Sequence, residues 1–120
     1  MAKEEKEYAE LSVIAQLEEE YPTIANGYKK IIREQYELFA SKHLDYGMTN
    51  VAAGTQLANE EEKQFALTGL FFRLNDKVQR LRQLVVNGQP DTVGESSLDT
   101  FQDLSVYGII AQIVSQKKFK

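Results

Sequence analysis

The chain has 120 residues, a length that fits one domain with a single hydrophobic core. It has no cysteine, which excludes a disulfide framework and any cysteine-based zinc site. The formal charge of −4 argues against a general binder of nucleic-acid polymers, which are usually recognised by basic proteins. A small anionic ligand remains compatible with this charge, because a local cluster of Arg and Lys can still hold phosphate.

Neither a signal peptide nor a membrane span is expected. Residues 1–10 are rich in Glu and Lys and lack the apolar core of a signal peptide. No stretch of the chain approaches the ~18 apolar residues that a transmembrane helix needs. These features predict a cytoplasmic protein with no membrane partner.

Hydrophobic periodicity predicts four helices, and strand signals are weak throughout. The predicted helices cover residues 3–20, 24–44, 59–86 and 95–116, with loops at 48–59 and 87–91. Asn59 is a suitable N-cap for the third helix, and three glutamates follow it in the first turn, where the helix dipole favours them. The expected fold is a single all-α domain over residues 1–120 that resembles a four-helix bundle.

Apolar residues at helical spacing define the expected core sides of the last two helices. In the third helix these are Leu67, Leu70, Phe71, Leu74, Val78, Leu81, Leu84 and Val85. In the fourth they are Leu98, Phe101, Leu104, Ile109, Ile110 and Ile113.

The third helix also carries a polar stripe. Gly69, Arg73, Asp76 and Arg80 follow one another at i, i+4, i+7 and i+11, with Lys77 adjacent. Arg and Lys bind phosphate oxygens, and Arg does so with a bidentate fork. The stripe therefore indicates a phosphate site, although it is also typical of a solvated face on which Asp76 and Arg80 form an ion pair.

The fourth helix begins with a stack of acids, Glu95, Asp99 and Asp103, at i, i+4 and i+8. Like charges at this spacing repel one another, so the stack suggests that a cation lies between them. Mg²⁺ is the natural candidate because it prefers hard oxygen ligands. Complementation of the helix dipole is the alternative, and it accounts for Glu95 and Asp99 but not for Asp103.

The sequence contains none of the motifs that would signal another kind of catalytic centre. A glycine-rich phosphate loop and a G-x-S-x-G elbow are both absent, and without cysteine there is no thiol nucleophile. The function classes that remain are hydrolysis by a metal-activated water and ligand binding without a reaction. Glu34, Glu37 and His43 are then all possible general bases, while a lone histidine is more often structural.

Two segments joined by a short loop carry a resemblance to a known family. They read GLFFRLNDKVQRLRQLV and GESSLDTFQDLSVYGIIAQIV, and KHLDYG precedes them. Over residues 31–114 the chain resembles the phage and bacterial nucleotide-modification-associated domain, which is related to MazG-like proteins. The resemblance implies an all-α nucleoside triphosphate pyrophosphohydrolase that binds Mg²⁺ and releases a monophosphate and pyrophosphate.

The resemblance also implies roles for particular residues. The acidic, catalytic cluster would be Asp76, Glu95, Asp99 and Asp103, with the metal held by Glu95, Asp99 and Asp103. The phosphates would face Arg73, Lys77 and Arg80, and the sugar or base would lie near Asp45 and Tyr46. The chain departs from the better-known MazG pattern, because the helix-four acids are spaced by four residues and the E-x-x-E pair at Glu34 and Glu37 lies on the second helix, well before Asp76.

Mg²⁺-dependent hydrolysis of a nucleoside triphosphate of dNTP type is therefore the expected function. The alternatives are a non-catalytic module of a phage or its host that sequesters a nucleotide or signal nucleotide, and a helical interaction protein with no ligand. A homo-oligomer, dimer or tetramer, is also expected. The reason is that apolar side chains lie on more than one side of their helices at Phe65, Phe71, Phe72 and the Ile109–Ile110 pair.

Overall fold

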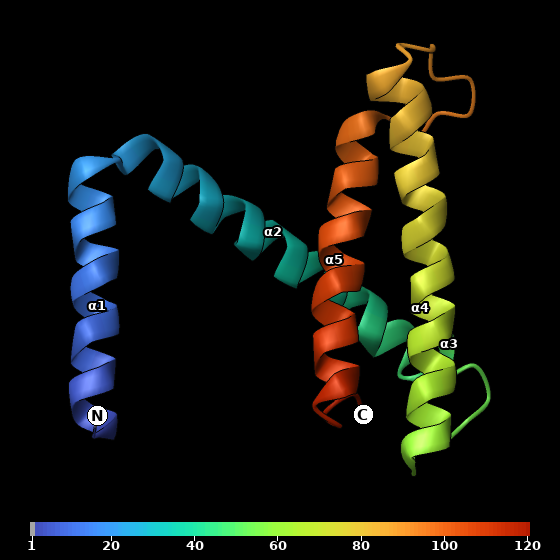
Figure 1. The fold of residues 1–120 in the computed structure, drawn as a ribbon, viewed down its shortest axis with the longest axis horizontal. Coiled ribbons are helices and arrows are strands. Elements are labelled where there is room, and N and C mark those ends of the chain that lie inside the picture. The colour runs from blue at the N-terminus through green and yellow to red at the C-terminus, as the bar shows by residue number, and fades with distance from the viewer. Residues whose placement is uncertain (1) are drawn as a thin grey trace. The chain divides into compact units, whose positions relative to one another are not determined.

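The computed structural model describes residues 2–120, with the exception of the side chain of residue 11 (Figure 1). All regular structure within residues 2–120 is helical, so the all-α prediction is confirmed. The elements are α1 Lys3–Glu20, α2 Pro22–Tyr46, α3 Thr49–Ala52, α4 Glu60–Leu81, a π-helical turn Arg82–Val86 and α5 Ser97–Ser115. None of the described helices is both long and apolar enough to cross a membrane.

The structure corrects one detail of the predicted helices and adds another. Residues 48–59 were predicted as a loop, but they contain the short helix α3, which forms because Val51 and Ala52 are both buried. The third predicted helix does reach Val86, but its last turn is a π-helix in which the Asn87 amide donates to the Arg82 carbonyl at 2.9 Å. The predicted N-cap is confirmed, since the Asn59 side chain accepts from the Glu62 amide at 2.9 Å.

The chain divides into two compact units, residues 1–38 and 39–120, with the boundary inside α2. In the first unit an ion pair of 2.9 Å between Lys29 and Glu18 joins α2 to α1. Among the described residues of this unit, only Ala25 and Gln35 are buried. Apolar side chains of the unit are exposed, including Val13, Ile14, Tyr21, Ile24, Tyr28, Ile31 and Ile32. The described side chains of residues 2–38 therefore form no hydrophobic core of their own.

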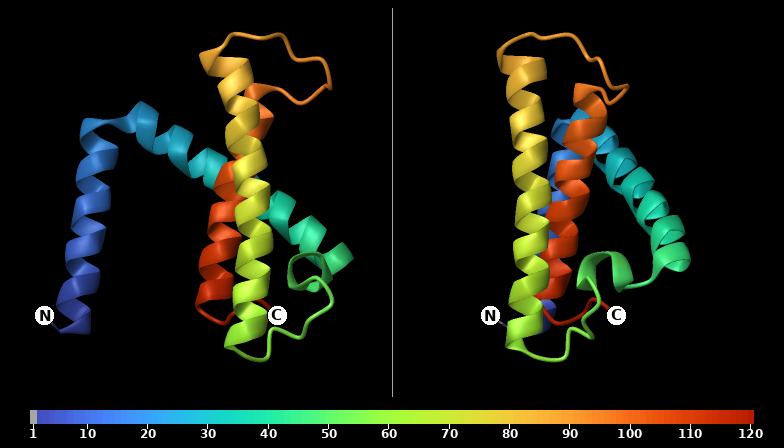
Figure 2. Two further views of the ribbon diagram at one scale, coloured as in Figure 1. Left: turned by 45° about the vertical axis from the view of Figure 1, so that its right-hand side comes forward. Right: turned by 90° about the vertical axis from the view of Figure 1, so that its right-hand side faces the viewer.

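The second unit is built on a hairpin of α4 and α5, which lie side by side in every view (Figures 1 and 2). Its core gathers near the start of α4 and the end of α5, and α3 packs against α4. The buried members of this core are Val51, Ala66, Leu70, Ile110, Val114 and Phe119.

The core sides predicted for α4 and α5 were partly wrong. Leu70 and Ile110 are buried as predicted. Several others are exposed instead: Phe71, Val78, Val85, Leu98, Phe101 and Ile109. The two helices meet along a narrower stripe that includes polar residues, so part of each apolar side faces outward.

The only histidine ties the C-terminal segment to the end of α2. The His43 Nε2 atom lies 2.8 Å from the backbone oxygen of Lys120. The His43 ring stacks on Phe39 at 5.3 Å and meets Phe119 edge-on at 5.2 Å. These contacts give His43 a structural role, and they hold Phe119 in the core.

Candidate functional site

The side of α4 that faces α5 changes character along its length. Its first two fully buried residues are Ala66 and Leu70, both apolar. The next three at helical spacing are Arg73, Lys77 and Arg80, all partly buried. The predicted cationic stripe is therefore turned toward the hairpin interior at these three positions, whereas Gly69 and Asp76 are exposed.

Lys77 is the centre of this polar region. Its Nζ lies 2.5 Å from Glu95 Oε1 and 3.0 Å from Asp103 Oδ2. The three side chains are 21%, 29% and 33% exposed, so water screens the pairs only in part. The hydrogen bond to Glu95 raises the pKa of Lys77, partial burial opposes this, and Asp103 adds to the rise. Two carboxylates eight residues apart thus converge on one cation.

Arg80 joins the same region to the loop before α5. Its Nη2 donates to Asp91 Oδ1 at 2.7 Å and to the backbone carbonyl of Glu95. Its Nε is buried and lies 3.4 Å from Glu95 Oε2, an ion pair without the geometry of a hydrogen bond. We call the set Lys77, Arg80, Asp91, Glu95 and Asp103 the ionic cluster.

Asp91 positions Glu95 through the backbone of the loop. Its Oδ1 accepts from the amides of Val93, Gly94 and Glu95 at 3.1, 3.0 and 3.3 Å. The bond from Val93 is the largest cause that lowers the pKa of Asp91, and Arg80 and the Glu95 amide add to it. Asp91 was not predicted as a site residue, although Asp after Pro90 is a turn signal from which this role could have been inferred.

Asp99 does not join the other two acids of the predicted stack. Its amide donates to Ser96 Oγ at 3.1 Å, and its Oδ2 accepts from the Ser96 amide at 3.2 Å. This reciprocal pair is a capping box that begins α5. Between Glu95 and Asp103 lies the ammonium group of Lys77. Within residues 2–120, no three acidic or histidine side chains are grouped as a metal site would require.

Arg73 lies one turn before the ionic cluster and has different partners. Its Nη2 donates to the Asn50 carbonyl at 2.8 Å, and its guanidinium lies 5.8 Å from the centre of the Tyr107 ring. Asp45 and Tyr46 are exposed at the end of α2, where the Tyr46 carbonyl accepts from Thr49. The structure thus brings Lys77, Arg80, Glu95 and Asp103 together and gives Arg73 a link to α3.

The ionic cluster offers part of the ligand set of a magnesium ion. Mg²⁺ is commonly bound through one or two carboxylates together with substrate phosphates. Glu95 and Asp103 supply two converging carboxylates, which suits an ion that arrives with a triphosphate better than a site built from protein ligands alone. No family model, curated protein or solved structure matches the chain. The residues of the cluster are therefore the basis for any functional assignment.

Proposed function

We propose that the ionic cluster binds the phosphates of a nucleoside triphosphate with Mg²⁺, and that the protein hydrolyses the nucleotide to a monophosphate and pyrophosphate. The observation that carries this proposal is the convergence of Glu95 and Asp103 on Lys77 at a partly buried position. Carboxylates held this close together need a cation, and the same cation site can serve a metal–phosphate group. The same chemistry is the expectation that the sequence resemblance to MazG-like proteins implies.

The residues of the cluster would have separate roles in this reaction. Bound magnesium would neutralise phosphate charge and make a bound water more acidic. Glu95 and Asp103 would hold the ion. Lys77, released from these carboxylates, would pair with a phosphate oxygen, while Asp91 keeps Arg80 in place. Asp99 would act through the start of α5, because its carboxylate is engaged in the capping box.

Sequestration of a nucleotide without cleavage is the second candidate function. It is favoured by the position of Lys77, whose ammonium group already pairs with both Glu95 and Asp103. Arg73 and Arg80 could then bind phosphates by exchanging their present partners, Asn50 and Asp91.

One mass-spectrometric assay separates the two functions. Purified protein is incubated with dNTPs, NTPs and cyclic nucleotides, with Mg²⁺ or with EDTA, and the nucleotides are identified after denaturation. Hydrolysis predicts monophosphate and pyrophosphate with Mg²⁺ only. Glu95→Gln should abolish the products, whereas Glu61→Gln, an exposed acid in the first turn of α4, should not. Binding that persists in EDTA with the ligand recovered intact would contradict hydrolysis and support sequestration.

Self-association is part of the same proposal. Phe65, Phe71 and Phe72 on α4 are 56%, 61% and 60% exposed, and large exposed apolar surfaces commonly mark interfaces. We expect sedimentation equilibrium to give a dimer or tetramer, and Phe72→Ser to shift the equilibrium toward monomer. A monomer at every concentration tested would contradict this.

A further inference from the structure

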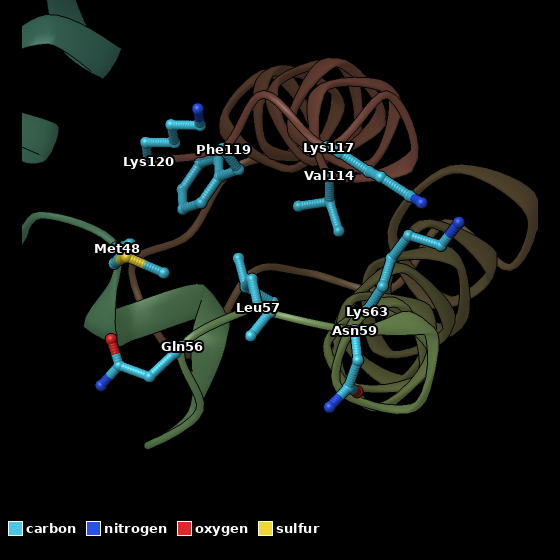
Figure 3. A pocket seen from close by; sticks show the side chains of 10 residues that line it. Met48, Gln56, Leu57, Asn59, Lys63, Val114, Lys117, Phe119 and Lys120 are labelled. Carbon is cyan, nitrogen blue, oxygen red and sulfur yellow. The ribbon is translucent and has the colours of Figure 1, made fainter.

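A second candidate site lies away from the ionic cluster, where the segment after α3, the start of α4 and the end of α5 meet. A cavity of about 240 Å³ opens there. Figure 3 shows that apolar side chains point into it from three parts of the second unit. These side chains are Met48, Leu57, Val114 and Phe119. Val114 and Phe119 are buried at 2% and 6% exposure, so this wall belongs to the core.

The rim of the cavity is cationic. The charged residues that line it are Lys63, Lys117 and Lys120, and no acid among the described residues lines it. In Figure 3, Lys63 and Lys117 reach toward one another beside Val114, and Lys120 lies next to Phe119. Three lysines around one small apolar cavity contrast with the net charge of −4 of the whole chain. The lining therefore favours an anion with an apolar body.

Glu60 already places a carboxylate between two of these lysines. Its Oε2 lies 2.8 Å from Lys63 and its Oε1 lies 2.8 Å from Lys117. These contacts lower the pKa of Glu60 to about 2, with the hydrogen bond from Lys117 as the largest cause. Glu60 does not line the cavity, and its side chain is 67% exposed. The ammonium groups of Lys63 and Lys117 are thus positioned to bind one carboxylate, and the exposed Glu60 side chain supplies it.

Backbone conformation at the cavity is also unusual. Leu57 has a φ angle of +52°, in the left-handed region that side chains other than glycine rarely adopt. Lys117, at +60°, follows the C-cap of α5, where this conformation is common, and the amides of Lys117 and Lys118 donate to the Val114 and Ile113 carbonyls at 3.0 Å. The amides on both sides of Leu57, those of Gln56 and Ala58, donate to Glu62 Oε1 and hold this turn. Strain of this kind is often retained at binding sites. Here it accompanies a Leu57 side chain that lines the cavity.

We propose that this cavity binds a small organic anion whose apolar body enters between Leu57, Val114 and Phe119. Its carboxylate or phosphate head pairs with Lys63 and Lys117 in place of Glu60. Pockets for drug-sized ligands span roughly 300–1,000 Å³, so a cavity of about 240 Å³ suits a smaller molecule. The site shares no residue with the ionic cluster, and it does not depend on the function proposed there.

A series of probes with one apolar body and different heads tests the charge preference. Hexanoate, hexyl phosphate, hexan-1-ol and hexylamine are titrated into ¹⁵N-labelled protein, and amide shifts are followed by NMR. Hexanoate and hexyl phosphate should move the amides of Leu57, Val114 and Phe119, and whichever binds tighter identifies the preferred head. Hexan-1-ol should bind more weakly and hexylamine should not bind. Equal binding of hexan-1-ol and the two anions would overturn the proposal.

Two variants with a matched control test the role of Glu60. Glu60→Gln removes the competing carboxylate, so hexanoate should bind about threefold tighter or more, the scale of an exposed ion pair. Lys117→Ala should weaken binding by a similar factor, whereas Lys118→Ala, an exposed neighbour outside the lining, should not. Lys63→Ala replaces Lys117→Ala if the latter lowers the melting temperature. Unchanged affinity in both Glu60→Gln and the lysine variants would show that the lysines do not bind the head.

Discussion

The two ends of the α4–α5 hairpin are closed by different interactions. Near the start of α4, Leu70 and Val114 are almost fully buried among other apolar side chains. Toward the end of α4, Lys77 and Arg80 pair with Glu95 and other acids that keep partial contact with water. The helices pack continuously, yet the interface changes from hydrophobic to ionic within two turns.

This difference indicates a division between stability and function. Burial of apolar area is non-directional and contributes most of the stability of a domain. Ion pairs that are about one-third exposed contribute little net stability, but they fix geometry and can exchange partners. The apolar end should therefore set the free energy of unfolding. The ionic end should hold a loop in place and respond to ligands.

The largest effect is expected at the apolar end. Leu70→Ala should lower the free energy of unfolding by about 2–5 kcal/mol, because it removes a side chain that is 2% exposed and leaves a cavity. Urea denaturation followed by circular dichroism measures this change. Leu98→Ala in α5 serves as the control, since Leu98 is 77% exposed and should matter far less. Equal losses of unfolding free energy in the two variants would contradict the larger contribution of the apolar end.

A smaller effect is expected at the ionic end. Lys77→Met leaves Glu95 and Asp103 without their shared cation and should cost about 1–3 kcal/mol. Because the pKa of folded Lys77 lies above its usual 10.5, this stabilisation is full below pH 10.5. It is then lost as the pH rises through the folded pKa. Urea titrations between pH 9 and 12 should show this loss in the wild type but not in Lys77→Met. A parallel decline in both would assign it to other groups.

The capping box at the start of α5 should contribute about 1 kcal/mol, the usual worth of an N-cap. Ser96→Ala removes the oxygen that accepts from the Asp99 amide and should destabilise the fold by this amount. Ser115→Ala, exposed at the last residue of α5, is the matched control. Thermal unfolding compares the two. A neutral Ser96→Ala would mean that the cap adds nothing to the stability of the hairpin.

The smallest effect is local. Asp91→Ala removes the acceptor of three loop amides, so hydrogen exchange at Val93, Gly94 and Glu95 should become faster while Leu70 keeps its protection. Because the pKa of Asp91 is lowered, the wild-type carboxylate holds these amides above pH 3.8 and releases them as the pH falls through the folded pKa. Unchanged exchange at the three amides would contradict this role.

Much of the local structure followed from the sequence. The limits of α1 were predicted as residues 3 and 20, and the Asn59 cap and the break after residue 86 were also predicted. These features depend on short-range chemistry: proline, capping side chains and helix-dipole complementation. The short helix α3 was missed because it forms to bury Val51 and Ala52 against distant residues.

The candidate site was only partly accessible from the sequence. The polar stripes predicted from the sequence include Lys77, Arg80, Glu95 and Asp103. The spacing along single helices could not show that these side chains meet. Asp99 shares the spacing of Glu95 and Asp103, yet its carboxylate accepts from the Ser96 amide. A spacing of four residues does not show whether an acidic side chain belongs to a binding site or caps a helix.

The sequence by itself determined that the chain is helical, where most helices begin and end, and which residues carry charge. Only the tertiary structure decided which side of each helix is inside. In α5 the inward residues Thr100, Asp103, Tyr107, Ile110 and Val114 follow one another at spacings of three and four. The more apolar Leu98 and Phe101 are 77% and 52% exposed. Hydropathy could not predict this, because Asp103 lies inside through its ion pair with Lys77 of α4, a residue 26 positions away.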